Sequence, residues 1–234
     1  MRQVRLELLR PAEIGEALAI NPTVYMPLGT IEWHCTHLPV GLDGLTAQGV
    51  CERAASTYGG LVYPALYFGT GGGHGDYPWT VMMPEPTEIR RLIEFALHRF
   101  EQFKVRKVVL FTGHFAPEQL GMIADIERVW NATDSTLTVV ARGINMAEGL
   151  AIDPDHAGMF ETSMLYSLWP DRVDLTQLEP LDPEHPVTDD WEESRHNPDH
   201  PLWGVIGPDP RNLDPDAAEP LLDATARWLA AQAT

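Results

Sequence analysis

The segment MPLGTIEWHCTHLPVGLD, residues 26–43, concentrates carboxylates and imidazoles to a degree that folding alone does not require. It follows an apolar run and precedes a predicted helix, and its prolines and glycines favour a shaped loop. Carboxylate and imidazole ligands together suit Zn, Mn or Fe. The alternative is a polar surface loop whose histidines are incidental, so the interpretation needs a second such cluster elsewhere in the chain. The residues concerned are Glu32, His34, His37 and Asp43.

Length and composition favour one soluble domain. The chain has 234 residues with 44% hydrophobic residues, enough for a full core. No apolar run approaches the ~18 residues of a membrane span, and the charged N-terminus has no signal-peptide pattern. Two cysteines, Cys35 and Cys51, are too few for a disulfide framework and are typical of a reducing compartment. We therefore expect a single cytoplasmic domain over residues 1–234.

The charge of the chain excludes one class of partner. There are 34 acidic and 16 basic residues, which gives a formal net charge of −18. Such a field repels the phosphate backbone of nucleic acids. A small-molecule substrate is the expected partner, with neither nucleic acid nor membrane.

Apolar runs alternate with segments of helical periodicity. This alternation predicts an α/β three-layer sandwich with a mostly parallel central sheet. A Pro-rich, acidic stretch at about 171–212 interrupts it and is expected to form an irregular arm, either an oligomer contact or a lid. The predicted strands are 23–28, 61–68, 105–112 and 137–142, and the predicted helices are 11–20, 46–58, 86–103, 118–131, 164–169 and 214–229.

Polar clusters follow each predicted strand. In an open parallel sheet, ligands bind outside the carboxyl ends of the strands, so we expect these clusters to converge on one edge. The loop after the second strand holds five glycines in seven positions, 69–75, and lacks the lysine of a phosphate-binding loop. Its glycines would let backbone approach a ligand closely, with His74 and Tyr77 as candidate substrate contacts or as structural residues. His114 follows the third strand, and Asp153 with His156 follows the fourth.

Three segments in the same order make the chain resemble the creatininase (creatinine amidohydrolase) family. They are PLGTIEWHCTHLPVGLD (27–43), TGH (112–114) and HAGMFETS (156–163). The first contains the specific pattern E-x-H-x-x-H-L-P-x-x-x-D. The resemblance covers roughly residues 20 to 170 and implies the family's fold and a metal-dependent hydrolase activity.

The resemblance also implies a binuclear metal site. Glu32, His34, Asp43 and His114 match family ligands of two divalent ions (Zn, Mn or Fe), with Asp43 in the bridging position. The fifth ligand departs from the pattern, because Ala116 stands where creatininase proper has a glutamate. We predict Glu161 in its place, with Glu118 as the reserve. The alternative for Glu161 is a carboxylate that only stabilises a helix N-terminus.

The remaining family positions concern catalysis and substrate. His156 matches the proton-transfer position and would protonate the leaving group. Asp153 matches a substrate-side acid, with a helix cap as the alternative role. His37 is expected to orient the ligand loop from behind. Phe115 is added to His74 and Tyr77 as a candidate substrate contact.

We therefore expect a metal-dependent hydrolase that attacks a small cyclic amide or related carbonyl compound through a metal-bridged hydroxide. The alternatives within the family are a hydrolase that opens an inositol-derived cyclic ketone and a formamide deformylase. Outside enzymes, the alternative is an inactive metal-binding subunit. The resemblance also implies a homo-oligomer, with a hexamer as one form.

Overall fold

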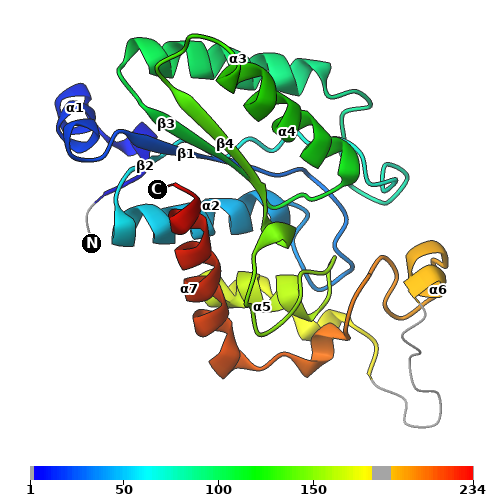
Figure 1. Cartoon of the computed structure of the whole chain (residues 1–234). Helices are drawn as coiled ribbons and strands as arrows, with labels where there is room; N and C mark the ends of the chain where they lie inside the picture. The colour runs from blue at the N-terminus through cyan, green and yellow to red at the C-terminus, as the bar shows by residue number, and fades with distance from the viewer. Residues whose placement is uncertain (1–2, 181–190, 234) are drawn as a thin grey trace.

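The computed structural model describes residues 3–180 and 191–233 and is built on a four-stranded parallel sheet (Figure 1). The strand order is β2-β1-β3-β4, so the first strand in the chain lies inside the sheet. Each pairing is parallel, which leaves all four carboxyl ends at one edge. The strands are β1 (Thr23–Leu28), β2 (Leu61–Val62), β3 (Lys107–Thr112) and β4 (Thr138–Gly143).

Helices cover both faces of the sheet, which confirms the predicted three-layer α/β architecture (Figure 1). On one face lie α3 (Thr87–Gln102) and α4 (Pro117–Asn131). On the other lie α2 (Leu42–Tyr58), α5 (Met159–Leu168) and α7 (Pro215–Gln232), with α2 against β1 and α7 against α2 and α5. The helix α1 (Pro11–Ile20) lies at the β2 side of the sheet. No helix in the described part of the chain is long and apolar enough to cross a membrane.

Two hydrophobic cores follow from the alternation of side chains along the strands. Val24, Met26 and Leu28 of β1 point to the face covered by α3 and α4. Tyr25 of the same strand points to the opposite face and packs with α2, α5 and α7. Because β1 and β3 are buried on both faces, their sequences are nearly continuous apolar runs, as expected for a parallel sheet.

Several boundaries differ from the sequence expectation. The strand expected over 61–68 ends at Val62. Pro64 has no N–H to donate to the neighbouring strand, which interrupts the hydrogen-bond ladder. Beyond it, an isolated bridge pairs Leu66 with Leu28 of β1. The helix expected from residue 46 begins at Leu42, which places Asp43 in a helical turn. The helix expected from residue 164 begins at Met159.

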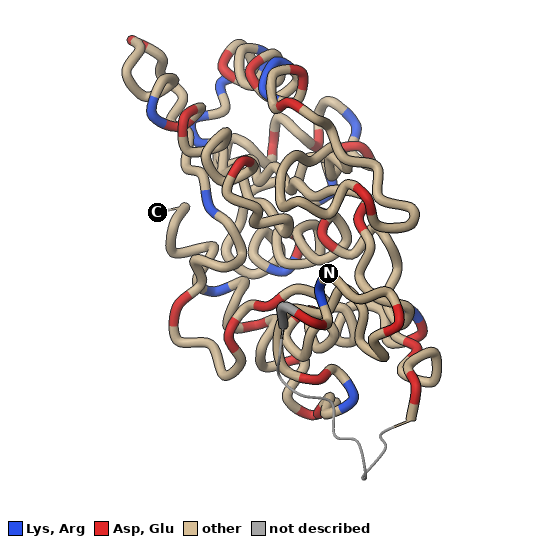
Figure 2. Tube along the Cα trace, turned by 90° about the vertical axis from the view of Figure 1, so that its right-hand side faces the viewer, with Lys and Arg blue, Asp and Glu red and all other residues tan. Residues whose placement is uncertain are grey.

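The described part of the arm, 171–180 and 191–212, is built from short helical turns that pack onto the core. Its segment around Ile206 pairs with His156 in an antiparallel bridge, and the indole N–H of Trp33 donates to the carbonyl of Trp203 at 3.1 Å. The turns in and beside the arm are η3 (Pro170–Arg172), η4 (Leu175–Gln177), α6 (Trp191–His196) and η5 (Pro210–Asn212), while η1 (Leu6–Leu8) and η2 (Ile144–Met146) lie elsewhere. Acidic positions outnumber basic ones along the whole described trace (Figure 2).

Two glycines let the start of α2 approach the carboxyl ends of β1 and β3. A Cβ on Gly29 would lie 2.2 Å from the backbone nitrogen of Gly44. A Cβ on Gly113 would lie 2.2 Å from the carbonyl oxygen of Asp43. No side chain fits at either distance, so the absence of a Cβ at both strand ends sets the position of Asp43.

Gly113→Ala should therefore both destabilise the protein and displace Asp43. Overpacking costs about 1–3 kcal/mol, and at about 2–4 °C per kcal/mol for a chain of this size this is a fall of roughly 2–12 °C in Tm. The matched control is Gly121→Ala in α4, where a Cβ would meet nothing within 4 Å. That change should leave Tm equal or raise it, since alanine is favoured over glycine in a helix by about 0.5–1 kcal/mol. Equal melting temperatures for the two variants would contradict the close approach.

Candidate metal centre

Five buried side chains from four parts of the fold meet beyond the carboxyl edge of the sheet. Each is at most 5% exposed. Two come from the loop after β1, one from the loop after β3, and two from the first turns of α2 and α5, whose N-termini favour carboxylates. They are Glu32, His34, His114, Asp43 and Glu161.

Three groups of three possible ligands occur among the described residues, and two of them share Asp43. The first of these two contains Glu32, Asp43 and His114. The Nδ1 atom of His114 lies 2.9 Å from Oε2 of Glu32 and 3.4 Å from Oδ2 of Asp43. One atom of each residue lies within 4.8 Å of the others, the spacing of donors around a single ion. Two carboxylate oxygens and one imidazole nitrogen are a typical donor set for Zn, Mn or Fe.

The second group contains His34, Asp43 and Glu161. The Nε2 atom of His34 lies 3.1 Å from Oδ1 of Asp43 and 3.6 Å from Oε2 of Glu161. One ligand atom each of His34, Asp43 and Glu161 lies within 4.8 Å of the other two. Asp43 belongs to both groups and presents a different oxygen to each, Oδ2 to the first and Oδ1 to the second.

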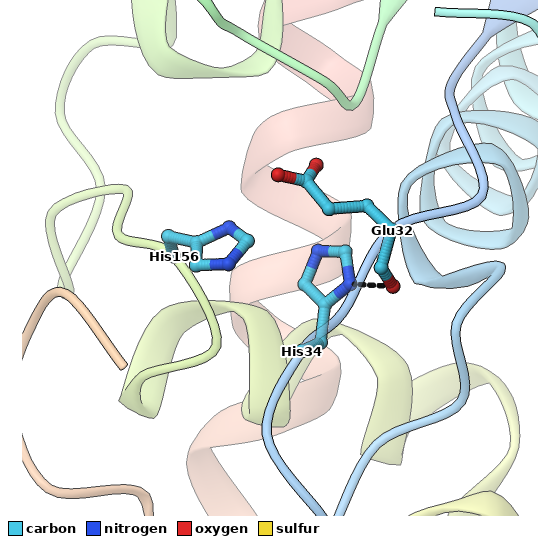
Figure 3. A group of neighbouring side chains, drawn as sticks. All are labelled: Glu32, His34 and His156. Atoms are coloured by element: carbon cyan, nitrogen blue, oxygen red, sulfur yellow. Dashed lines mark hydrogen bonds between the residues drawn. The ribbon is translucent and has the colours of Figure 1, made fainter. Parts of the chain in front are cut away.

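The other nitrogen of each histidine is held by backbone. Nε2 of His114 donates to the carbonyl of Thr70 at 3.2 Å, and Nδ1 of His34 donates to the carbonyl of Glu32 at 3.0 Å (Figure 3). Such contacts fix the tautomer and aim the remaining nitrogen at a metal. Oε2 of Glu32 and Oδ2 of Asp43 are buried, and apart from the nearby Nδ1 of His114 they have no polar partner among the described residues. These oxygens, both in the first group, fit a bound cation.

The ionisation of the cluster reflects its burial and its mixed charges. Burial alone would lower the pKa of His34, but Asp43 and Glu161 outweigh it and raise this pKa to about 10. For His114 the same balance, with Asp43 and Glu32 as the anions, also raises the pKa to about 10. Burial raises the pKa of Glu161 well above its ordinary value. A cation at the site would replace protons on these groups.

His156 lies at the end of the loop that follows β4, and with Glu32 and His34 it forms the third group of possible ligands. Its ring centroid is 4.6 Å from those of His34 and His74, and its Nε2 donates to the carbonyl of Trp33 at 3.1 Å. Figure 3 shows the carboxylate of Glu32 and the rings of His34 and His156 turned toward one another. Burial, together with the charge of His34, lowers the pKa of His156 to about 3, so its imidazole is neutral.

Comparison with known proteins decides the family. The family model for creatinine amidohydrolase, named Creatininase, matches residues 7–233, nearly the whole chain. The chain belongs to the creatininase family. Members of this family are metal-dependent amidohydrolases that act on C–N bonds.

Two curated relatives are similar to this creatininase-family chain. The creatinine amidohydrolase of Pseudomonas putida is 26% identical over 174 residues, 65% of this chain and 66% of that protein. The mycofactocin precursor peptide peptidase of Mycolicibacterium smegmatis is 27% identical over 164 residues, 67% of this chain and 62% of that protein. The chain thus aligns with slightly less than two thirds of the length of each.

Solved structures support the same fold. A mutant creatininase of the Zn-Zn type superposes on this chain with a TM-score of 0.74 at 22% sequence identity. The superposition covers 99% of this chain and 97% of the creatininase chain. The structure named Creatininase Mn gives a TM-score of 0.72 at 22% identity, over 98% and 97% of the two chains. At this identity the likeness establishes the fold.

The two candidates for the fifth ligand of the creatininase pattern lie in different places. Glu161 lies in the second group, where its Oε2 also accepts the N–H of Ala157 at 2.6 Å. Glu118 lies outside both groups: its Oε2 accepts the N–H of Gly72 at 3.2 Å and holds the glycine loop. Ala116 has no donor atom to offer. Glu161 is therefore the carboxylate placed to complete the second group.

The acid that caps the start of α5 is Asp155 and not Asp153. Asp153 is exposed at the rim of the cavity described below. The helix-capping role considered for it is performed by Asp155, whose carboxylate accepts the N–H groups of Gly158 at 3.2 Å and Phe160 at 2.9 Å. Burial raises the pKa of Asp155 to about 6. Because Asp153 and Asp155 both follow β4, the sequence alone did not show which of them caps the helix.

A cavity of about 670 Å³ opens onto the cluster. It is lined by Glu32, Asp43, His114, His156 and Glu161 and, from the predicted substrate contacts, by His74 and Phe115. Tyr77 is not among its lining residues; it packs 5.0 Å from the ring of His74 and donates its hydroxyl to the carbonyl of Arg195. His74 in turn bonds Oε1 of Glu32. Another cavity, of about 410 Å³, lies between α1 and α3 and is lined almost wholly by apolar side chains.

His37 lies behind the cluster. It is buried, and its Nε2 is 3.0 Å from the hydroxyl of Thr162 in α5. Burial lowers the pKa of His37 to about 3, so the ring is neutral. This contact ties the ligand loop to the helix that carries Glu161, which is the geometry an orienting residue needs.

Removal of metal should make stability depend on pH. His34 and His114, whose ordinary pKa is 6.5, have it raised to about 10 without a cation. A group with a raised folded-state pKa stabilises below its unfolded pKa, and this contribution is lost as pH rises through the folded value. The Tm of chelator-treated protein should therefore fall between pH 6.5 and 10, and thermal scans across that range measure it.

The control for this measurement is the same protein with zinc restored, in which both imidazoles are deprotonated ligands. Its Tm should be higher throughout and should change little in the same range. A chelator-treated protein whose Tm did not fall, or followed the zinc-loaded protein, would contradict the ligand assignment.

Proposed function

We propose that the chain is a two-metal hydrolase of amide bonds, with a small cyclic amide as its substrate. The observation that carries this proposal is Asp43, shared between two groups of three ligands at the floor of one cavity. One ion would be held by Glu32, Asp43 and His114, and the other by His34, Asp43 and Glu161. Zinc and manganese are the favoured metals, because the two creatininase structures described above are of the Zn-Zn type and with Mn.

The ions, when bound, would lower the pKa of a water molecule and polarise the substrate carbonyl. The proton transfers would be carried out by residues of the chain itself. The Nε2–H of His156 donates to the carbonyl of Trp33, which leaves Nδ1 as the nitrogen that can accept a proton. It would accept the proton of the attacking water and return it to the departing nitrogen, so that one imidazole acts as base and then as acid.

The substrate class rests on the relatives and on the cavity. The Pseudomonas putida relative is a creatinine amidohydrolase, which supports a cyclic amide. The cavity of about 670 Å³ falls within the roughly 300–1,000 Å³ typical of small-molecule sites.

A second candidate is a peptide amide. The Mycolicibacterium smegmatis relative, a peptide peptidase, is as similar to this chain as the creatinine amidohydrolase is. The cavity also exceeds the lower end of the usual size range about twofold, which leaves space for an extended ligand. Neither relative is named as a hydrolase of a ring ketone or of a formamide, so these alternatives stay outside the proposal.

Two variants distinguish metal binding from proton transfer. Asp43→Asn should remove most bound metal and all activity, since it takes one ligand from each group. His156→Ala should keep the wild-type metal content and lower kcat about 10²- to 10⁴-fold, the usual contribution of a general acid–base. Elemental analysis gives the metal content, and a screen of creatinine, cyclic ureides and short peptides gives the activity.

The control is His98→Ala, which removes a histidine that packs against Trp130 at a tilt, away from the cluster. It should leave metal content and kcat unchanged. Full activity in His156→Ala would refute the proton-transfer role, and a full metal complement in Asp43→Asn would refute the shared ligand.

A further inference from the structure

One basic side chain of the arm lines the cavity. Arg195 belongs to the last turn of α6, and its Nη2 donates to the carbonyl of Gly72 at 2.9 Å. Among the described residues, no carboxylate lies within ion-pair distance of its guanidinium. Only one of its five N–H groups has a partner in the described part of the chain.

The position of Gly72 places this guanidinium near the metal cluster. A Cβ on Gly72 would lie 3.6 Å from Cε1 of His114 and 3.3 Å from Cβ of Ala116. Gly72 therefore contacts a ligand histidine on one side and bonds Arg195 on the other. Because Arg195 and the cluster line the same cavity, a ligand bound there can contact both.

Several contacts fix the backbone that carries Arg195. The hydroxyl of Tyr77 donates to the carbonyl of Arg195. The preceding Ser194 donates its hydroxyl to the carbonyl of Val205 at 2.7 Å and accepts, through its own carbonyl, the N–H of Gly204 at 2.9 Å. The charge is thus presented by a short helix bonded to two other segments, which lowers the cost of ordering it around a ligand.

The charge balance of the cavity makes Arg195 distinctive. Among the described residues that line the cavity, Arg195 is the only lysine or arginine, and five are acidic: Glu32, Asp43, Asp153, Asp155 and Glu161. The chain has 16 basic against 34 acidic residues, and in the described part most of the other arginines are paired with carboxylates. An arginine that faces a cavity without such a partner is available to pair with an anion from outside.

We propose that Arg195 binds a carboxylate of the substrate, so that the substrate is an amide bearing a carboxylate group. This inference rests on the proposed function, because it places the scissile carbonyl at the metal ligands and the carboxylate at Arg195. The planar guanidinium matches a carboxylate through two parallel hydrogen bonds, a geometry that lysine does not reproduce. The carboxylate comes either from a substituted ring or from the C-terminus of a short peptide.

Two pairs of probes test the proposal and distinguish these sources. Dihydroorotate and dihydrouracil are cyclic ureides that differ by one carboxylate. N-acetylglycine and its primary amide are the corresponding peptide-like pair. Calorimetry with the zinc-loaded protein gives the Kd of each probe, and the ratio within a pair isolates the carboxylate.

The wild-type protein should bind the carboxylate member at least tenfold more tightly in one of the pairs. Arg195→Gln should bring that ratio to within threefold of one, and Arg195→Lys should give an intermediate ratio. The matched control is Arg172→Gln, an exposed arginine of the same arm that does not line the cavity. It should keep the wild-type ratio. Metal content and Tm, measured for every variant, should stay at wild-type values.

Three results would overturn the proposal. The first is a wild-type protein that prefers the carboxylate in neither pair. The second is a preference that persists in Arg195→Gln, since the carboxylate would then bind the metal ions. The third is an equal loss of affinity for both members of a pair, which would mean that Arg195 only holds Gly72. Because binding is measured, a failure of turnover would count against the proposed function and leave this test intact.

Discussion

The close approach of the N-terminus of α2 to the ends of β1 and β3 is the constraint on which the site depends. Backbone contacts at Gly29 and Gly113 are too short for any side chain, so the first turn of the helix lies directly over two adjacent strand ends. Asp43 projects from that turn between His34 of the β1 loop and His114 of the β3 loop. The parallel sheet supplies the converging loops, and this contact supplies the shared carboxylate.

The cluster so formed is costly without a cation. Three carboxylates and two imidazoles are each at most 5% exposed, and the raised pKa values of His34 and His114 indicate that bound protons offset their negative charge when no cation is present. Burial of like charges costs several kcal/mol per ion unless they are paired. Divalent ions would relieve this cost and bind the buried oxygens of Glu32 and Asp43. Metal binding would therefore stabilise this fold.

The strands, most helices and the edge that holds the site followed from apolar runs and from the rule for parallel sheets, because these signals are local. What sequence reasoning missed came from contacts between distant segments. Asp43 was expected in a loop, since apolar periodicity begins only after it. Asp155 rather than Asp153 caps α5, because the turn at Gly158 brings the N–H groups of Gly158 and Phe160 to the carboxylate of Asp155. Arg195 lies 123 residues from its partner Gly72, in an arm without periodicity, and no local pattern marks it.

The arm now has a defined place, in its described part, as one wall of the cavity over the cluster. The central claim remains that Asp43 joins two metal ions, and anomalous diffraction from a crystal of the zinc-loaded protein tests it most directly. The account predicts two zinc peaks per chain, one against Glu32 and His114 and one against His34 and Glu161, with an oxygen of Asp43 on each. A single peak, or a pair in which Asp43 contacts only one ion, would contradict it.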